Sequence, residues 1–257
     1  MKAVTYLIKE NTGGDAVTAQ YAIRSHTWAE SAADAMNSST ALYSLLGPGG
    51  NQTWDYENSA YGTWTGQKER NSTAALLQLA RLAKARSANV CLLLTWATLT
   101  DTSATNFISS QALLNDHYLK AAAAVKADTG LEAFIAPAGL AWQKIYNEMN
   151  TTAAGIPIGL DRFLALYNPN DLRHPSSLGT LLAASTIASA ITGCKSVDGD
   201  SGVLGASVPW SSHLKKASDN VVFQPDFNLT LPAYPWQLQT GLDTVPQCLP
   251  RNSTVLY

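Results

Sequence analysis

Apolar and polar positions along this chain form short apolar runs separated by longer amphipathic stretches. Residues 89–96 make an almost continuous apolar run, which is typical of a strand buried on both faces. Residues 4–8 and 131–136 are shorter apolar runs, and we expect a strand at each. Because such runs alternate with helical patterns, the sequence favours βα units and an α/β fold with a parallel sheet.

Helical periodicity fills most of the chain between these runs. Residues 72–86 place leucines on one face and lysine and arginine on the other, which predicts an amphipathic helix. We expect further helices over residues 28–46, 109–127, 140–149, 160–167 and 175–192. Residues 51–70 are polar and aromatic without a clear period, so they predict no element.

The character of the sequence changes towards the C-terminus, where prolines become frequent and helical periodicity is lost. We therefore expect an α/β domain over residues 1–193 and an irregular, loop-rich extension over residues 194–257 that packs on it. Trp210, Tyr234 and Trp236 of the extension either contact a sugar or attach the extension to the core.

Residues 175–193 are uncharged and long enough to raise the question of a membrane span. The stretch contains serines, threonines and an internal glycine, and it directly follows Arg173 and His174. We interpret it as a buried helix.

Composition narrows the class of partner. The 257-residue chain has a net charge of -2 and only 14% charged residues, which excludes the basic surface typical of nucleic-acid binding. Its 7 Trp and 10 Tyr suit a site for a sugar or an ester, although protein cores use the same residues. We expect a small-molecule or carbohydrate ester as partner, and neither nucleic acid nor a membrane.

Sequons and cysteines bear on the cellular compartment. Asn-x-Ser/Thr sequons without a middle proline occur at Asn37, Asn51, Asn71, Asn150, Asn228 and Asn252. They favour a glycosylated protein of the secretory pathway or the extracellular space. Cys194 and Cys248 flank the C-terminal extension and can close it as a disulfide, while Cys91 lies in an apolar run and is expected to be a buried thiol.

Residues 1–9 lack the apolar segment and cleavage site of a signal peptide. If the sequons are used, we expect the start of the secreted chain to lie upstream of this sequence. His26 and His117 have no partner at the spacing of a metal site, and no phosphate-binding loop is present, so we expect neither a metal nor a cofactor.

The chemically most informative feature is the pair Asp171 and His174, three residues apart before an apolar helix. An imidazole becomes an effective general base when a carboxylate fixes its tautomer and stabilises the imidazolium ion that forms. Pro175 predicts a helix start that makes His174 the N-terminal cap, where the positive helix end favours the neutral ring. The alternative is that both residues only cap a turn.

Further segments strengthen the catalytic interpretation. Asp171 and His174 are followed by a Pro-Ser pair, a glycine and a helix of small residues, while residues 93–97 read Leu-Leu-Thr-Trp-Ala. Residues 135–142 read Ile-Ala-Pro-Ala-Gly-Leu-Ala-Trp. In this order, the segments resemble the SGNH (GDSL-type) hydrolase family, most closely its sialate O-acetylesterase-like branch. The resemblance covers about residues 1–193 and implies a three-layer α/β/α sandwich like that of flavodoxin.

The resemblance also implies roles for single residues. Asp171 would orient His174, His174 would be the general base, and Gly13 or Gly14 would donate a backbone N–H to the oxyanion. Independently of the resemblance, Trp96 and Trp142 lie at predicted strand and turn ends, where they would form the floor of a substrate pocket, although core packing is the favoured role for Trp142.

The family's nucleophilic serine follows the first strand, and no such segment precedes residues 4–8. Ser59, in Glu-Asn-Ser-Ala, is the nearest candidate, but no apolar strand leads into it and the motif order differs. We expect the nucleophile segment to be missing from the N-terminus, so that the sequence is truncated.

The complete protein is therefore expected to hydrolyse carboxylic esters, in particular acetyl esters on carbohydrate, by a Ser-His-Asp mechanism. The alternative is an inactive pseudo-hydrolase that serves as a binding or scaffold protein.

Overall fold

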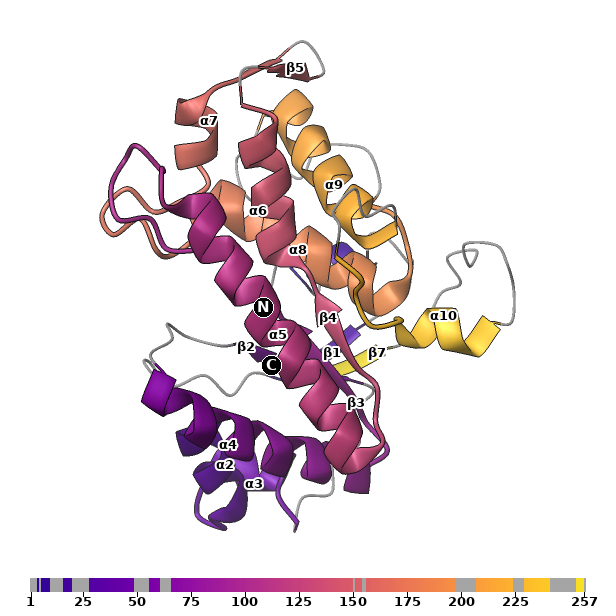
Figure 1. Cartoon of the computed structure of the whole chain (residues 1–257). Coiled ribbons are helices and arrows are strands. Elements are labelled where there is room, and N and C mark those ends of the chain that lie inside the picture. The colour runs from indigo at the N-terminus through magenta and orange to yellow at the C-terminus, as the bar shows by residue number, and fades with distance from the viewer. Residues whose placement is uncertain are drawn as a thin grey trace.

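The computed structural model has a mixed α/β fold that is mostly helical (Figure 1). The structure describes residues 4, 6–9, 16–19, 28–48, 56–60, 66–149, 151–153, 156–196, 207–223, 229–240 and 253–256. All structural statements below concern these residues.

A parallel sheet of five strands runs through the molecule. Its strands, in spatial order, are β1 (Ala16–Ala19), β7 (Ser253–Leu256), β2 (Tyr56–Ala60), β3 (Asn89–Leu93) and β4 (Ala133–Ala136). Every neighbouring pair is parallel, so all strands end at the same edge of the sheet. A separate antiparallel pair consists of β5 (Thr151–Ala153) and β6 (Ile156–Ile158).

The helices form two groups that meet at the sheet (Figure 1). The first group is α2 (Trp28–Met36), α3 (Ala41–Leu45), α4 (Gly66–Ala85) and α5 (Phe107–Thr129). The second group is α6 (Ala138–Asn147), α7 (Leu160–Leu164), α8 (Ser177–Thr192), α9 (Val208–Phe223) and the short α10 (Pro235–Thr240). Both α5 and α8 pack against β4.

The α/β class is confirmed, and the strands predicted over residues 89–96 and 131–136 are present as the shorter parallel strands β3 and β4. The strand predicted over residues 4–8 is wrong, because Val4 and residues 6–9 are helical. Val4, Leu7 and Ile8 are buried there, at the i, i+3 and i+4 positions of one helix face.

The single helix predicted over residues 28–46 is two helices, α2 and α3. The chain turns at residues 37–40, where Thr40 caps α3 and its Oγ1 accepts the N–H of Tyr43 at 3.2 Å. Helix breaks of this kind follow from Ser, Thr and Asn side chains that compete for backbone N–H groups.

The C-terminal extension is more regular than the sequence indicated. Helix α9 packs against α6 and α8, and β7 lies inside the main sheet between β1 and β2. Trp210, Tyr234 and Trp236 are buried, and the indole N–H of Trp236 donates to the carbonyl of Ala190 at 3.0 Å. These three aromatic side chains therefore attach the extension to the core.

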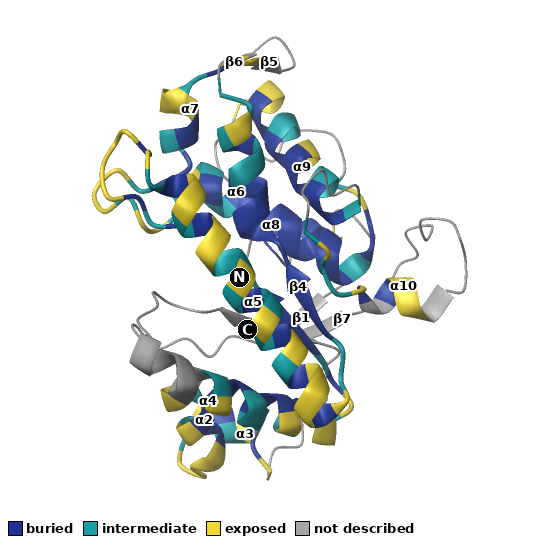
Figure 2. Ribbon diagram, viewed as in Figure 1, coloured by how far each residue is buried: buried dark blue, intermediate teal, exposed yellow. Residues whose placement is uncertain are grey.

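Helix α8 is buried on almost every side, as the dark blue ribbon between α6 and α9 shows (Figure 2). Its buried residues run without a gap from Leu181 to Ile191, which explains the all-round apolar pattern seen in the sequence. Among the helices that the structure describes, none has both the length and the hydropathy needed to cross a membrane.

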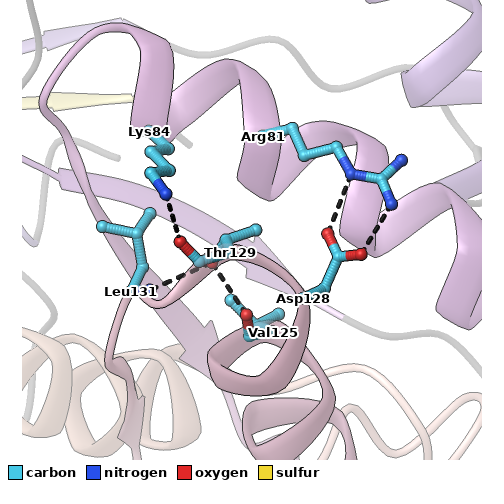
Figure 3. A network of polar contacts seen from close by, with 6 residues as sticks. All are labelled: Arg81, Lys84, Val125, Asp128, Thr129 and Leu131. Carbon is cyan, nitrogen blue, oxygen red and sulfur yellow. Dashed lines mark hydrogen bonds and ion pairs between the residues drawn. The ribbon is translucent and has the colours of Figure 1, made fainter.

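Polar contacts fix the end of α5 where the chain turns into β4 (Figure 3). Asp128 accepts two hydrogen bonds from the guanidinium of Arg81 on α4, at 2.8 and 2.6 Å, and this guanidinium lowers the pKa of Asp128. Lys84, also on α4, donates to the carbonyl of Thr129. The next residue, Gly130, has a φ of 75° and ends α5 in the left-handed conformation. The orientation of β4 relative to α4 is thereby set.

Candidate active site

The candidate site is built on the edge of the sheet where β3 and β4 end. The N–H of Leu94 donates to the carbonyl of Ala136 at 3.0 Å, and the N–H of Gly139 donates to the carbonyl of Leu94 at 2.7 Å. A Cβ atom on Gly139 would lie 2.3 Å from the carbonyl of Thr95, so only glycine allows this approach. The Pro-Ala-Gly turn of the sequence therefore joins the two strand ends.

Two side chains hold residues 94–99, which follow β3. Gln111, fully buried on α5, accepts the N–H of Ala97 at 2.9 Å and donates to the carbonyl of Thr95 at 3.2 Å. The hydroxyl of Tyr167 donates to the carbonyl of Ala97 at 2.9 Å, and burial raises the pKa of this hydroxyl, which keeps it a donor. The backbone after β3 is thus fixed from two sides.

A cluster of aromatic side chains packs together next to the segment that follows β3. The ring centroid of Phe163 on α7 lies 4.9 Å from that of Phe107 on α5, 5.1 Å from that of Tyr146 on α6, and 5.6 Å from that of Tyr167. Each of these pairs has the edge-to-face geometry that aromatic quadrupoles favour. The cluster joins three helices and places Tyr167 at the start of the loop that carries Asp171.

The loop of residues 168–176 is closed on itself at its base. The N–H of Asn168 donates to the carbonyl of His174 at 2.7 Å, and Tyr167 and Pro175 form an antiparallel bridge. Within the loop Leu172 has a φ of 50°, a left-handed conformation that costs energy in a residue other than glycine. Its carbonyl accepts the N–H of Leu99 at 3.1 Å, which ties the strained residue to the segment after β3.

The loop brings Asp171 and His174 into direct contact. Oδ2 of Asp171 lies 2.7 Å from Nδ1 of His174. Oδ1 accepts the backbone N–H groups of Arg173 and His174, each at 2.9 Å. The Arg173 N–H, followed by the imidazole and the His174 N–H, lowers the pKa of Asp171 to about 2. The carboxylate is therefore ionised at neutral pH and can only accept.

An ionised partner determines the tautomer of the ring. Because Asp171 cannot donate, Nδ1 of His174 carries the proton, and Nε2 of the neutral ring has a free lone pair. The His174 side chain is 67% exposed, and Nε2 has no hydrogen-bond partner within the described ranges. The predicted pairing is present, and its basic nitrogen is open to a ligand.

The predicted cap is wrong. Ser176, and not His174, caps α8: its Oγ accepts the N–H groups of Leu178 and Gly179 at 3.1 and 3.3 Å. Pro175 is extended in its bridge with Tyr167, and the residue before a proline avoids the helical region. His174 therefore lies outside the first turn of α8, beyond the range at which the helix dipole would favour its neutral ring.

Trp96 lies beside the loop of residues 168–176, and its role at a pocket floor stays a prediction. Its ring stacks on Trp142 with centroids 4.1 Å apart and planes 10° from parallel. Its Nε1–H donates to the carbonyl of Arg173 at 3.0 Å. Trp142 itself is fully buried.

Other predicted residues are placed only in part. Ser59 lies inside the polar strand β2, where its backbone pairs with Leu92 of β3. Its side chain lies outside what the structure describes, as do Gly13, Gly14 and Cys248. Cys194 is buried after α8. Its pairing with Cys248 stays a prediction.

Of the sequons, Asn37 is the one whose side chain the structure describes, and it is exposed after α2. Its Oδ1 accepts the hydroxyl of Ser39 at 2.8 Å. Asn71 lies in α4 with only its backbone described, and the remaining sequons, Asn51, Asn150, Asn228 and Asn252, lie outside the described residues. Glycosylation stays a prediction.

In the described ranges, no three His, Cys, Asp or Glu side chains are grouped to hold a metal ion. His213 instead pairs with Glu148 at 2.8 Å, which connects α9 to the end of α6. Cys91 is buried in β3 as expected, and burial raises the pKa of its thiol.

Sequence reasoning missed the residues that hold the site in place. Gln111 is a polar residue in a helix, and only its contact with the backbone after β3 distinguishes it from a surface residue. Tyr167 and Leu172 fall in a turn whose left-handed residue is a leucine, without the glycine or asparagine that normally signals such a conformation.

No protein-family model matches the sequence, and no curated protein is detectably similar to it. Among solved structures, the chain is similar to the crystal structure of a DUF4886 family protein from Bacteroides uniformis, with 18% sequence identity and a TM-score of 0.49. The similarity covers 70% of this chain and 66% of that chain, which is just under two thirds of its length.

Proposed function

We propose that this protein is a hydrolase of carboxylic esters of the SGNH type, with His174 as general base and Asp171 as its orienter. The observation that carries the proposal is the 2.7 Å contact between Nδ1 of His174 and Oδ2 of Asp171, in a His174 side chain that is 67% exposed. A serine hydroxyl placed at Nε2 would lose its proton to the ring as its oxygen attacks the acyl carbon.

The rigidity of the carboxylate supports a catalytic role over a turn cap. A cap needs only the backbone bonds that Oδ1 makes to Arg173 and His174. Here the second oxygen is directed at the imidazole, which it would hold in one tautomer and stabilise when the ring becomes charged.

The location also supports the proposal. Ligands of open parallel α/β sheets bind outside the carboxyl ends of the strands. The loop of residues 168–176, which carries the Asp171–His174 dyad, is hydrogen-bonded to the segment after β3. Because α5 and α8 both pack on β4 from separate helix groups, we propose a three-layer α/β/α arrangement for the fold. A small neutral ester, such as an acetylated sugar, fits the low charge of the chain.

A non-catalytic binding or scaffold protein is the second candidate. It is favoured by the absence of any hydroxyl bonded to Nε2 of His174 among the described residues. In that case the dyad would be a remnant, and the open edge of the sheet would bind a ligand without turnover.

Hydrolysis of a chromogenic acetate ester separates the two candidates. An enzyme would release the chromophore, and His174→Ala would lower kcat/KM by roughly 1000-fold or more, because the base is lost. Asp171→Asn would reduce kcat strongly, because an amide can donate to Nδ1 and stabilise the wrong tautomer.

Asp101→Asn is the matched control for Asp171→Asn. Asp101 also accepts a backbone N–H, from Ser103 at 2.8 Å, and it lies in an exposed loop without an imidazole. We expect this variant to keep the wild-type rate. A folded wild-type protein without turnover would favour the binding protein, and turnover that survives His174→Ala would refute the proposed base.

A further inference from the structure

The peptide unit between Arg173 and His174 is held at both of its polar atoms. Its carbonyl, on Arg173, accepts the indole N–H of Trp96 at 3.0 Å. Its N–H, on His174, donates to Oδ1 of Asp171 at 2.9 Å. Because a peptide unit is planar, fixing one of these atoms fixes the direction of the other.

The indole of Trp96 is itself held in place. It stacks on Trp142 at 4.1 Å, and Trp142 is fully buried beneath it. On another side of Trp142 lies Gly179 of α8, where an added Cβ would come within 2.8 Å of the ring. Trp96, which follows β3, is therefore held against the core by its stacking on Trp142, and it links the core to the middle of the loop of residues 168–176.

We propose that Trp96 is a positioning residue for the dyad: its indole N–H orients the Arg173–His174 peptide so that Asp171 stays aligned with Nδ1 of His174. This inference rests on the proposed role of the dyad and adds a residue that touches neither reacting atom. Within the described part of the chain the carboxylate has three donors, the N–H groups of Arg173 and His174 and the ring Nδ1–H.

Loss of the indole N–H removes the restraint on one of those donors. The peptide can then rotate, the His174 N–H moves off Oδ1, and the carboxylate is free to turn away from the ring. Leu172 adds to this tendency, because its φ of 50° is strained and relaxes when the loop is released. The imidazole then loses the contact that selects its tautomer.

The tautomer of His174 is the readout that tests this role, because a purely structural contact would not change it. Long-range ¹H–¹⁵N spectra of protein labelled in its 4 histidines report which ring nitrogen carries the proton, and His174→Gln assigns the signal. In the neutral ring of the wild-type protein we expect the proton on Nδ1. In Trp96→Phe, which keeps a ring to stack on Trp142, we expect the ratio of Nδ1–H to Nε2–H to fall roughly fivefold or more, the factor that one hydrogen bond supplies.

Tyr167→Phe is the matched control. It removes another aromatic donor to a backbone carbonyl of the same region, that of Ala97 at 2.9 Å, without touching the Arg173–His174 peptide. We expect this variant to be destabilised and to keep the proton on Nδ1. If Trp96→Phe does not fold, a benzothienyl-alanine at position 96 keeps the size and stacking of the indole and lacks only the N–H.

The outcomes separate this inference from the proposed function. Wild-type spectra with the proton on Nε2 would refute the dyad geometry and with it the role of Trp96. A wild-type proton on Nδ1 that stays there in Trp96→Phe or the benzothienyl variant would overturn the positioning role and leave the dyad intact. A shift of the proton in these variants and not in Tyr167→Phe would support the inference.

Discussion

At the scale of single residues, the site depends on contacts that tolerate little change. The carboxylate of Asp171 accepts three hydrogen bonds, Leu172 is held in a left-handed conformation, and Gly179 packs against the carbonyl of Leu166. Each of these features fixes the loop of residues 168–176, so substitutions there are expected to act through geometry as much as through chemistry.

Asp171 makes stability depend on pH in a defined direction. Its pKa is lowered to about 2, so its contribution to the free energy of unfolding is present above its unfolded pKa, about 3.9. That contribution is lost as the pH falls towards 2. We therefore expect the difference in unfolding free energy between wild type and Asp171→Asn to shrink as the pH is lowered from 6 to 2 in urea titrations. A difference that does not vary with pH would contradict the hydrogen-bonded geometry of the carboxylate.

Among the glycines that the structure describes, Gly179 is the one whose added methyl group would approach another atom most closely. A Cβ there would lie 2.1 Å from the carbonyl of Leu166 and 2.8 Å from the ring of Trp142. Gly179→Ala should lower the free energy of unfolding by about 2 kcal/mol, measured by chemical denaturation. In Gly159→Ala the new methyl group has nothing within 4 Å, and we expect almost no change. Equal effects of the two variants would show that α8 does not approach the loop as described.

At the scale of elements, the packing of α9 on α8 and α6 integrates the C-terminal extension into the core. The interface uses small polar residues: Ser218 donates to the carbonyl of Leu182 at 3.0 Å and accepts from Thr186 at 3.1 Å. Beside them, Asp219 accepts the hydroxyl of Ser189 at 2.9 Å. Side chains of this size let two helices approach closely while their hydroxyls stay bonded.

Leu214→Ala tests whether α9 is a packed helix. Leu214 is fully buried on α9, so truncation should cost about 3 kcal/mol of unfolding free energy. Lys216, two residues along the same helix, is exposed, and Lys216→Ala should stay within about 0.5 kcal/mol of wild type. The comparison is made by urea titration. Two neutral variants would mean that the extension is irregular, as its sequence suggested.

The elements that the sequence predicted are those with a strong local pattern. Strands β3 and β4 are buried apolar runs, and α5 and α8 are long helices, so their own residues specify them. Strand β2 reads Tyr-Glu-Asn-Ser-Ala and has no apolar alternation. Its own residues therefore do not predict a strand, and its neighbours in the sheet, β7 and β3, specify it. Pro209 lies in the first turn of α9, where proline is tolerated. The frequent prolines of the C-terminal extension therefore do not exclude a helix there.

The candidate site, like the elements, could be predicted from the sequence only where its contacts are local. The spacing of Asp171 and His174 was enough to predict their contact, because both lie in one short loop. The cap at Ser176 was not predicted, since Pro175 offered an equally regular helix start two residues before the observed start at Ser177. Contacts between distant segments, such as that of Trp96 with Arg173, follow from the fold and have no local signal.

At the scale of the whole molecule, distant parts of the chain meet at one edge of the sheet. The segment after β3, the first turn of α6 and the loop before α8 are joined by hydrogen bonds through Leu94, Leu99 and Trp96. A parallel sheet places all its strand ends at this edge, which is where a nucleophile for His174 has to lie if the protein is an enzyme.

Labelling of the full-length protein with a fluorophosphonate tests this account most directly. A serine activated by His174 attacks the phosphorus atom, fluoride leaves, and the hydroxyl proton passes to Nε2. Mass spectrometry of the intact protein should show one covalent adduct, peptide mapping should place it on a serine, and His174→Ala should abolish it while Asp101→Asn keeps it. A folded wild-type protein that forms no adduct, or an adduct that forms equally in His174→Ala, would contradict the account.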